Sequence, residues 1–403
     1  MLVTEKKTNI AHQVVTHRFF RSIEAAGADW DAAAPPHDVF LQRPYLSVVQ
    51  HHPPKGMRFG YLVFYKEETP VGVALCQIKY FRADENIQEP EESAAKSGCF
   101  FIGLAQWLKK QFTGFVSADV LICGNLLLTG EHGFYFNPLE IHAEQGIRLL
   151  EQALAQVSKL LEKSGIRTPV TLLKDLLPLR SAEGRFLDKA GFVEFKVQPN
   201  MTLQLPFADF EAYLAAMSTK YRTRAKRAFK KLEGVEKREM TLHDVRHELT
   251  HIYNLYRKIA QNAGFNMVDL NEDYLFALKR DFSPHFRIFG YYKDNALIAY
   301  YTAMRNGTSL EAHFLGYEQS LNHDLQLYLN MLYDLVRLGL ETNCEELVFA
   351  RTALEIKSSV GAEPHDLLCY LRHNNAFANR FAEPLIDYLN PIEVWEQRHP
   401  FKS

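Results

Sequence analysis

The feature that most constrains the fold is a pattern of three strands, a helix and a fourth strand, which occurs twice along the chain. The first copy opens at 57–81, where two apolar runs flank the charged turn KEETP, a hairpin signature. The second copy opens at 286–307, where similar runs flank KDNA, about 225 residues further on. Two unrelated stretches could match by chance. Because element order, element lengths and the hairpin match together, we favour duplication.

The rest of each copy follows the same order. In the first, an apolar run at 117–128 precedes a segment whose helical spacing of apolar residues is carried by Ile147, Leu150, Leu154, Val157 and Leu161. In the second, a strand at 309–317 and a short polar loop precede a helix at 325–341. New strands follow at 169–173 and 346–350. We therefore predict an α/β protein with mixed (α+β) sheets in two tandem domains, 1–205 and 206–403.

Composition excludes several classes of protein. The chain has 403 residues, 47% of them hydrophobic, which is enough for two cores. The N-terminus has no apolar signal-peptide core, and the longest apolar runs are far shorter than the roughly 20 residues of a spanning helix. Five cysteines without CxxC spacing and sixteen histidines without a zinc-helix pattern predict no metal. We expect a cytoplasmic protein without a transmembrane segment.

One short stretch gathers positive charge in a chain whose formal net charge is −2. The segment KYRTRAKRAFKK, 220–231, holds seven Lys or Arg and no acid, and as a helix it keeps one apolar face. A solvated face and an anionic membrane surface are two interpretations. We favour ligand phosphates or nucleic acid, because surface helices usually interleave Glu with their basic residues. The predicted contacts are Lys220, Arg222, Arg224 and Arg227.

The strand at 309–317 carries the first catalytic candidates. Strand alternation puts four side chains on one face: Glu311, His313, Leu315 and Tyr317. A carboxylate and an imidazole are costly to bury without a purpose, and either could deprotonate an attacking amine. The alternative is a hydrogen-bonded structural pair. Tyr317 and Tyr301 are weaker substrate-binding candidates, and a tyrosine at position 301 is more often part of a core.

Two cations follow the next strand. Arg351 and Lys357 are expected beyond the carboxyl ends of the strands, where open α/β sheets bind ligands. There they would hold a substrate carboxylate or stabilise an oxyanion. The alternative is a surface ion pair with Glu355 or Glu363, which would contribute little.

Several phrases resemble one superfamily. FLDKAGF looks like the late helix-to-strand junction of the GNAT acyltransferases, and two such domains in tandem resemble the FemABX group and its FemAB-like relatives. These relatives carry phrases similar to HDVFLQRPYLSVVQ at 37–50, and a basic helix early in the second domain. They also share the final run, here FARTALEIKSSVGAEP, which contains Arg351 and Lys357.

The resemblance implies a specific architecture for the site. In the superfamily two central parallel strands splay apart, the gap receives a pantetheine arm, and the next helix presents its N-terminus to the pyrophosphate. Here the splay would lie between 309–317 and 346–350, and the helix would start near 322–325. The usual basic, Gly-rich turn is replaced by the acidic EQSLNHD at 318–324. The FemABX group takes its aminoacyl group from tRNA instead of CoA.

We therefore expect an acyltransferase that moves an acyl or aminoacyl group from a CoA thioester or aminoacyl-tRNA to a small-molecule or peptide amine. The second domain would carry the site and the first would be a degenerate copy. Glu311 or His313 would take the proton, and Arg351 or Lys357 would stabilise the oxyanion. Acyl-CoA would be a substrate, not a tightly bound cofactor. Two other hypotheses stand: an inert module that binds tRNA or another polyanion through 220–231, and a peripheral membrane enzyme acting on a lipid precursor.

Overall fold

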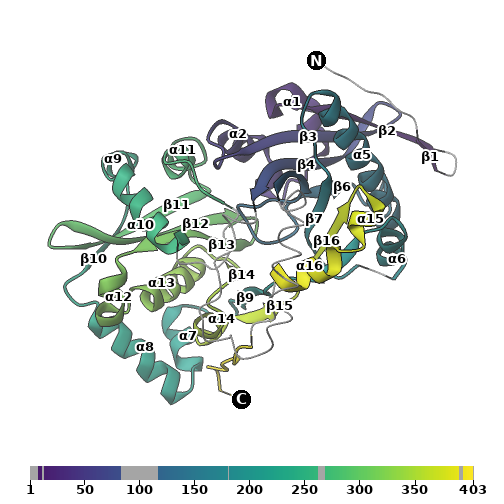
Figure 1. Cartoon of the computed structure of the whole chain (residues 1–403). Coiled ribbons are helices and arrows are strands. Elements are labelled where there is room, and N and C mark those ends of the chain that lie inside the picture. Colours follow the sequence, from purple (N-terminus) through teal and green to yellow (C-terminus); the bar gives the residue numbers. More distant parts are fainter. Residues whose placement is uncertain are drawn as a thin grey trace, which may run out of the picture.

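Two sheets flanked by helices make up the chain (Figure 1). The computed structural model describes residues 8–10, 13–82, 117–179, 181–261, 268–389 and 394–402.

The first sheet contains nine of the described strands, in the order β1-β2-β3-β4-β5-β7-β16-β8, with β6 paired to β4. Their bounds are β1 Thr8–Ile10, β2 Gln13–Phe20, β3 Met57–Lys66, β4 Thr69–Arg82, β5 Ser117–Cys123, β6 Phe134–Phe136, β7 Val170–Leu176, β8 Val193–Lys196 and β16 Leu368–His373. Only β5 and β7 pair in parallel; the other described pairs of this sheet are antiparallel.

The second sheet contains seven of the described strands, in the order β10-β11-β12-β13-β14-β9-β15. Their bounds are β9 Asn200–Gln204, β10 Glu236–Glu239, β11 Phe286–Lys293, β12 Ala296–Asn306, β13 Ser309–Tyr317, β14 Glu346–Ala350 and β15 Glu363–His365. Here β13 and β14 form the parallel pair.

Helices cover both sheets. In the first half they are α1 Ile23–Ala33, the 3-10 turn η1 Val39–Leu41, α2 Arg43–His51, α5 Ala143–Lys163 and α6 Ser181–Lys189. In the second half they are α7 Phe210–Ala216, α8 Thr219–Lys231, α9 Leu242–His247, α10 Leu249–Gln261, α11 Tyr274–Asp281, α12 Gln319–Leu325, α13 Leu327–Glu341, α14 Leu354–Ser358, α15 Ala376–Asn379 and α16 Ala382–Leu389. None of the described helices combines the length and apolar composition needed to cross a bilayer.

The predicted repeat is confirmed. The order β3-β4-β5-α5-β7 in the first half matches β11-β12-β13-α13-β14 in the second. The apolar residues that predicted the first crossover helix are buried on one side of α5. The predicted polar loop 318–324 is wrong, because most of it forms the short helix α12. Gln326 in a left-handed conformation (φ 51°, ψ 42°) separates α12 from α13.

The two halves exchange strands. β9, from before residue 206, lies in the second sheet between β14 and β15, whereas β16 inserts into the first sheet between β7 and β8 (Figure 1). In β9, Met201 and Leu203 are buried in the second core, which stabilises the exchange by about 2 kcal/mol per side chain. The domain boundary near residue 206 stays a prediction, because each sheet contains a strand from the other side of that residue.

The halves also share one hydrophobic core. Trp30, Tyr45 and Leu46 from α1 and α2 belong to the same buried cluster as Tyr274 and Leu278 of α11. Separate clusters lie on the outer faces, one between the first sheet and α5 and one between the second sheet, α8 and α13. The shared cluster holds one face of β13 against the first half of the chain.

Candidate active site at a fork between two strands

The central parallel strands of the second sheet pair over only three residues. Ser309, Leu310 and Glu311 of β13 pair with Glu346, Leu347 and Val348 of β14. Beyond Glu311, β13 runs on to Tyr317 with no partner in β14. We call this point the strand fork.

A bulge on each strand produces the fork. On β13, two residues, His313 and Phe314, stand opposite Thr302 alone. On β14, Phe349 is the extra residue against β9, and Ala350 adopts a positive φ of 58°. Because a bulge bends its strand and increases its twist, two bulges directly after the last mutual pair drive the strands apart.

The Thr302 side chain stabilises the bulge on β13. Its hydroxyl accepts a hydrogen bond from the Phe314 N–H and donates one to the Phe314 carbonyl, both at 2.8 Å. Both backbone groups displaced by the bulge therefore have a partner, as buried peptide groups require.

Glu311 lies at the last paired position of the fork. Its side chain is 6% exposed. Burial raises the pKa of Glu311 to about 7; the charge of His132 opposes this rise, and that of Asp38 adds to it. Burial of a carboxylate disfavours its charged form, so this group exchanges its proton near neutral pH.

His132 comes from the first half of the chain and is a residue that the sequence analysis missed. Its Nδ1 lies 3.0 Å from Oδ2 of the buried Asp38. Burial works to lower the pKa of His132, but the hydrogen bond and charge of Asp38 outweigh it, so the pKa rises. The sequence placed this histidine only in the Gly-containing turn TGEHGFYFNP.

The loop that carries His132 occupies the corresponding end of the first sheet. β5 stops at Cys123, after four residue pairs with β7. Within the loop a Cβ on Gly133 would come 2.7 Å from the Gly124 Cα, so the backbone closes on itself there. The Lys174 ammonium, on β7, donates to the Leu128 carbonyl at 2.8 Å. The loop thus fills the end of β5 in the first half and delivers His132 to the second.

His313 is held by hydroxyl groups. The Tyr274 hydroxyl lies 3.3 Å from Nε2, and the Thr302 hydroxyl lies 3.4 Å from Nδ1. Burial lowers the pKa of His313 to about 3, so the ring is neutral at physiological pH. The rings of Phe286 and Phe314 also contact it.

The bulge also corrects one expectation. Glu311 and His313 face the side of the sheet shared with the first half, but Leu315 and Tyr317 pack with the other core. The prediction that all four side chains share one face was wrong, because the extra residue at 313–314 inverts the alternation of side chains along the strand.

Arg351 is engaged by the first half. Its guanidinium forms a bidentate ion pair with Asp175 of β7, which is 0% exposed, and its Nε donates to the Gln198 carbonyl at 2.8 Å. Lys174 pairs with the same carboxylate. Burial works to raise the pKa of Asp175, but the two cations lower it below its ordinary value. The ion pair considered from sequence, with Glu355 or Glu363, is absent among the described ion pairs.

Lys357 is buried under the end of β14. It is 4% exposed, and its ammonium donates to the carbonyls of Ala350 and Arg351. Burial lowers the pKa of Lys357 to about 7. It supports the turn in which Thr352 and Ala353 adopt positive φ.

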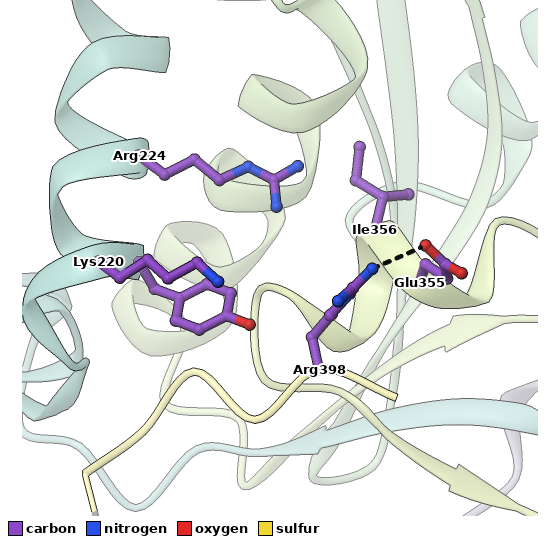
Figure 2. Close-up of a pocket in the computed structure, with 6 residues that line it drawn as sticks. Lys220, Arg224, Glu355, Ile356 and Arg398 are labelled. Carbon is purple, nitrogen blue, oxygen red and sulfur yellow. Dashed lines mark hydrogen bonds and ion pairs between the residues drawn. The ribbon is translucent and has the colours of Figure 1, made fainter. Parts of the chain in front are cut away.

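The predicted basic helix is α8. Lys220, Arg224 and Arg227 are exposed, whereas Arg222 is half-buried. Among the described residues, none of these four side chains has a carboxylate within 4.0 Å. Lys220 and Arg224 line a cavity of about 380 Å³ together with Tyr221, Glu355, Ile356 and Arg398 (Figure 2).

The two tyrosine candidates have different surroundings. Tyr301 is 5% exposed, stacks on Phe289 with ring centroids 5.0 Å apart, and belongs to the second core. Tyr317 is half-buried beside Tyr328 of α13, on the side of the sheet that faces away from Glu311.

The fold is similar to that of tandem GNAT proteins. The tandem GNAT protein from the clavulanic acid biosynthesis pathway, solved without AcCoA, superposes with a TM-score of 0.50 at 12% identity, covering 89% of this chain and 99% of that one. FemX matches with a TM-score of 0.48 at 11% identity, over 85% and 97%. L-PGS from Bacillus licheniformis matches with 0.43 at 11%, over 85% and 95%. No curated protein matches the chain in sequence.

The first of these matches confirms the predicted fold: the chain has the architecture of two tandem GNAT domains. Residues 219–363, which include the fork, match the sequence model described as an acetyltransferase (GNAT) domain.

Proposed function

We propose that the protein is an N-acyltransferase that uses the strand fork to hold the acyl donor and Glu311 to deprotonate the acceptor amine. The observation that carries the proposal is the position of Glu311: a buried carboxyl at the last residue pair before β13 and β14 part. The backbone edge of β13 beyond it has no partner in β14, so an extended arm of the donor can pair with it.

Glu311 is a better base than His313. A general base works best when its pKa lies near the operating pH. The pKa of Glu311 is raised to about 7, whereas that of His313 is lowered to about 3. His313 also has both ring nitrogens near hydroxyl groups, which suits a role in holding the bulge.

The reaction follows from these roles. The neutral amine attacks the donor carbonyl, the new C–N bond forms, and the C–S or C–O bond to the carrier breaks. Glu311 accepts the proton that the amine loses, and either the protonated Glu311 or water gives a proton to the departing thiolate or alkoxide. Burial works to lower the pKa of His132, but Asp38 raises it and so favours the charged form. The charge of His132 lowers the pKa of Glu311, which increases the fraction of ionised base.

The first half therefore has a supporting role in the proposal. It supplies His132 and Asp38, and it fixes Arg351 through Asp175. Arg351 in this arrangement positions the end of β14. Lys357 supports the turn that follows β14, because its ammonium donates to the carbonyls of Ala350 and Arg351. The β13 edge that has no partner in β14, and Lys357, are the candidates for stabilising the oxyanion.

A donor-consumption assay tests the proposal. Wild-type protein is incubated with a panel of acyl-CoAs or aminoacyl-tRNAs and a panel of amines, and free thiol or deacylated tRNA is measured. Glu311→Gln should lower turnover by about 10²–10⁴-fold, the usual contribution of a general base. His313→Gln is the matched control on the same strand and should retain more activity. Equal activity of Glu311→Gln and wild type would refute the assignment.

The basic surface of α8 favours a second function, an inert module that binds a polyanion. Its exposed cations lack carboxylate partners among the described residues. Such a module would bind RNA with a steep salt dependence and would consume no donor.

A further inference from the structure

The cavity beside α8 is built by three segments that are distant in sequence. Lys220, Tyr221 and Arg224 come from α8, Glu355 and Ile356 come from α14, and Arg398 comes from the C-terminal segment. In Figure 2 the Lys220 and Arg224 side chains extend from α8 toward the opposite side, where Arg398 and Glu355 lie. Its volume of about 380 Å³ falls in the range of small-ligand sites, roughly 300–1,000 Å³.

The charges in this cavity suit an anion. Three cations and one carboxylate leave a net charge of +2. Glu355 is already paired with Arg398 at 3.4 Å, and Arg398 also contacts Glu396 at 2.6 Å. Lys220 and Arg224 have no such partner among the described residues. Since they are four residues apart on one helix, both point to the same side of α8.

The C-terminal segment is fastened at both ends of the cavity. The Arg398 N–H donates to the Ser358 hydroxyl at 2.9 Å, and the Glu396 N–H donates to Glu355 at 3.3 Å. At the other end Phe401 pairs with Met217, directly before α8. Arg398 is therefore held in place across from Lys220 and Arg224.

The elements around the cavity follow the carboxyl ends of the two strands that form the fork, or pack on elements that do. α14 directly follows β14, and α8 packs against α12 and α13, which follow β13. The cavity is thus lined by α14, which follows β14, and by α8, which packs on the helices that follow β13.

We propose that this cavity binds the phosphate groups of the acyl donor, a phosphate- or pyrophosphate-bearing thioester of the CoA type. The inference rests on the proposed transferase function for the identity of the ligand. It replaces the phosphate site expected at a helix start near 322–325, where the structure has the end of α12 and the left-handed Gln326 in place of a basic, Gly-rich turn. Arg and Lys supply charge-assisted hydrogen bonds to phosphate oxygens.

Inorganic pyrophosphate is the probe for the test, with binding to the full chain measured by calorimetry and by thermal shift. Arg224→Gln and Arg398→Gln should each raise the dissociation constant for pyrophosphate by about tenfold or more, because each variant loses one charged hydrogen bond to it. Arg227→Gln, on the same helix but not lining the cavity, is the matched control and should stay within about twofold. Equal weakening by Arg227→Gln, or no pyrophosphate binding by wild type, would overturn the proposal.

A gain-of-binding variant guards against misfolding. Among the described residues that line the cavity, Glu355 alone carries a carboxylate, and Glu355→Gln removes it. Pyrophosphate should therefore bind more tightly than to wild type, a result that an unfolded protein cannot imitate. Weaker binding by this variant would contradict the proposal. Tighter binding of a ten-nucleotide RNA than of pyrophosphate, with Arg227→Gln as harmful as Arg224→Gln, would assign α8 to a nucleic acid instead.

The pocket and the reaction can fail separately. Glu311→Gln should keep pyrophosphate affinity while it loses turnover. If wild type binds pyrophosphate but consumes no donor, the transferase function fails and the pocket stands. If transfer occurs and Arg224→Gln leaves the KM for the donor unchanged, the pocket assignment fails and the function stands.

Discussion

The ion pair between Arg351 and Asp175 gives the sharpest test of whether a cation at the fork is structural or catalytic. Arg351→Met removes a bidentate partner from a carboxylate that is 0% exposed. Lys174, the Gly130 N–H at 3.2 Å and the Cys369 thiol at 3.7 Å remain as its partners. Breaking a buried pair from one side costs about 3–5 kcal/mol, and we expect the lower value because one cation remains.

Equilibrium urea unfolding at neutral pH measures this loss. With a slope of about 3 kcal/mol per molar urea, a loss of about 3 kcal/mol lowers the midpoint by about 1 M. The cations hold the pKa of Asp175 below its ordinary value, so its stabilisation is present at neutral pH and is lost as the pH falls through the folded-state pKa. The difference between variant and wild type should therefore shrink in acid.

A double-mutant cycle with Asp175→Leu completes the experiment. The double variant should be destabilised by less than the sum of the single changes, because the two residues interact directly. The structural interpretation is refuted if Arg351→Met keeps the urea midpoint of wild type and loses only donor turnover. Arg351 would then act on the substrate.

The other predictions concern the fork and its surroundings. Burial raises the pKa of Glu311 to about 7, so the folded protein favours the protonated carboxyl. The free energy of unfolding of wild type, measured at each pH, should therefore fall by up to about 3 kcal/mol between pH 5 and 8, whereas that of Glu311→Gln should not show this fall. His132→Gln removes a charge that lowers the pKa of Glu311, so the acid limb of the activity profile should move to higher pH; an unmoved limb would exclude the coupling. Thr302→Val leaves the Phe314 N–H and carbonyl without a side-chain partner, so it should lower the free energy of unfolding by about 1–3 kcal/mol in thermal unfolding. The KM for the donor should rise as the bulge relaxes. An unchanged melting temperature and KM would show that the bulge does not need the hydroxyl. Gly316→Ala would place a Cβ 2.7 Å from the backbone of Leu255 and should destabilise the folded protein by about 1–3 kcal/mol. Gly184→Ala, which has open space around its Cβ, should not destabilise it. Equal melting temperatures for the two variants would contradict this packing.

Much of the fold followed from sequence because hydrophobic periodicity is local. The hairpins, both crossover helices and the parallel strands after them could be predicted from short windows. Strand exchange could not, since nothing within β9 or β16 specifies which of two similar sheets completes its hydrogen bonds.

The candidate site shows the same limit. Glu311 was accessible to sequence reasoning because a carboxylate inside an apolar strand is costly. His132 was not, because its role depends on a loop of one half meeting a strand of the other. Arg351 was predicted near the fork, but its partner Asp175 lies 176 residues earlier in the chain. The bulge at 313–314 inverted the face assignment of Leu315 and Tyr317, and a single inserted residue leaves no mark on an alternating pattern.

The crossed arrangement of β9 and β16 sets the order in which this polypeptide can mature on the ribosome. β9 leaves the exit tunnel long before β14, against which it pairs, and the position between β7 and β8 stays vacant until β16 is made. Neither half can be expressed alone without an open strand edge that invites aggregation. A chain cut near residue 206 should therefore be recovered only when both fragments are produced together.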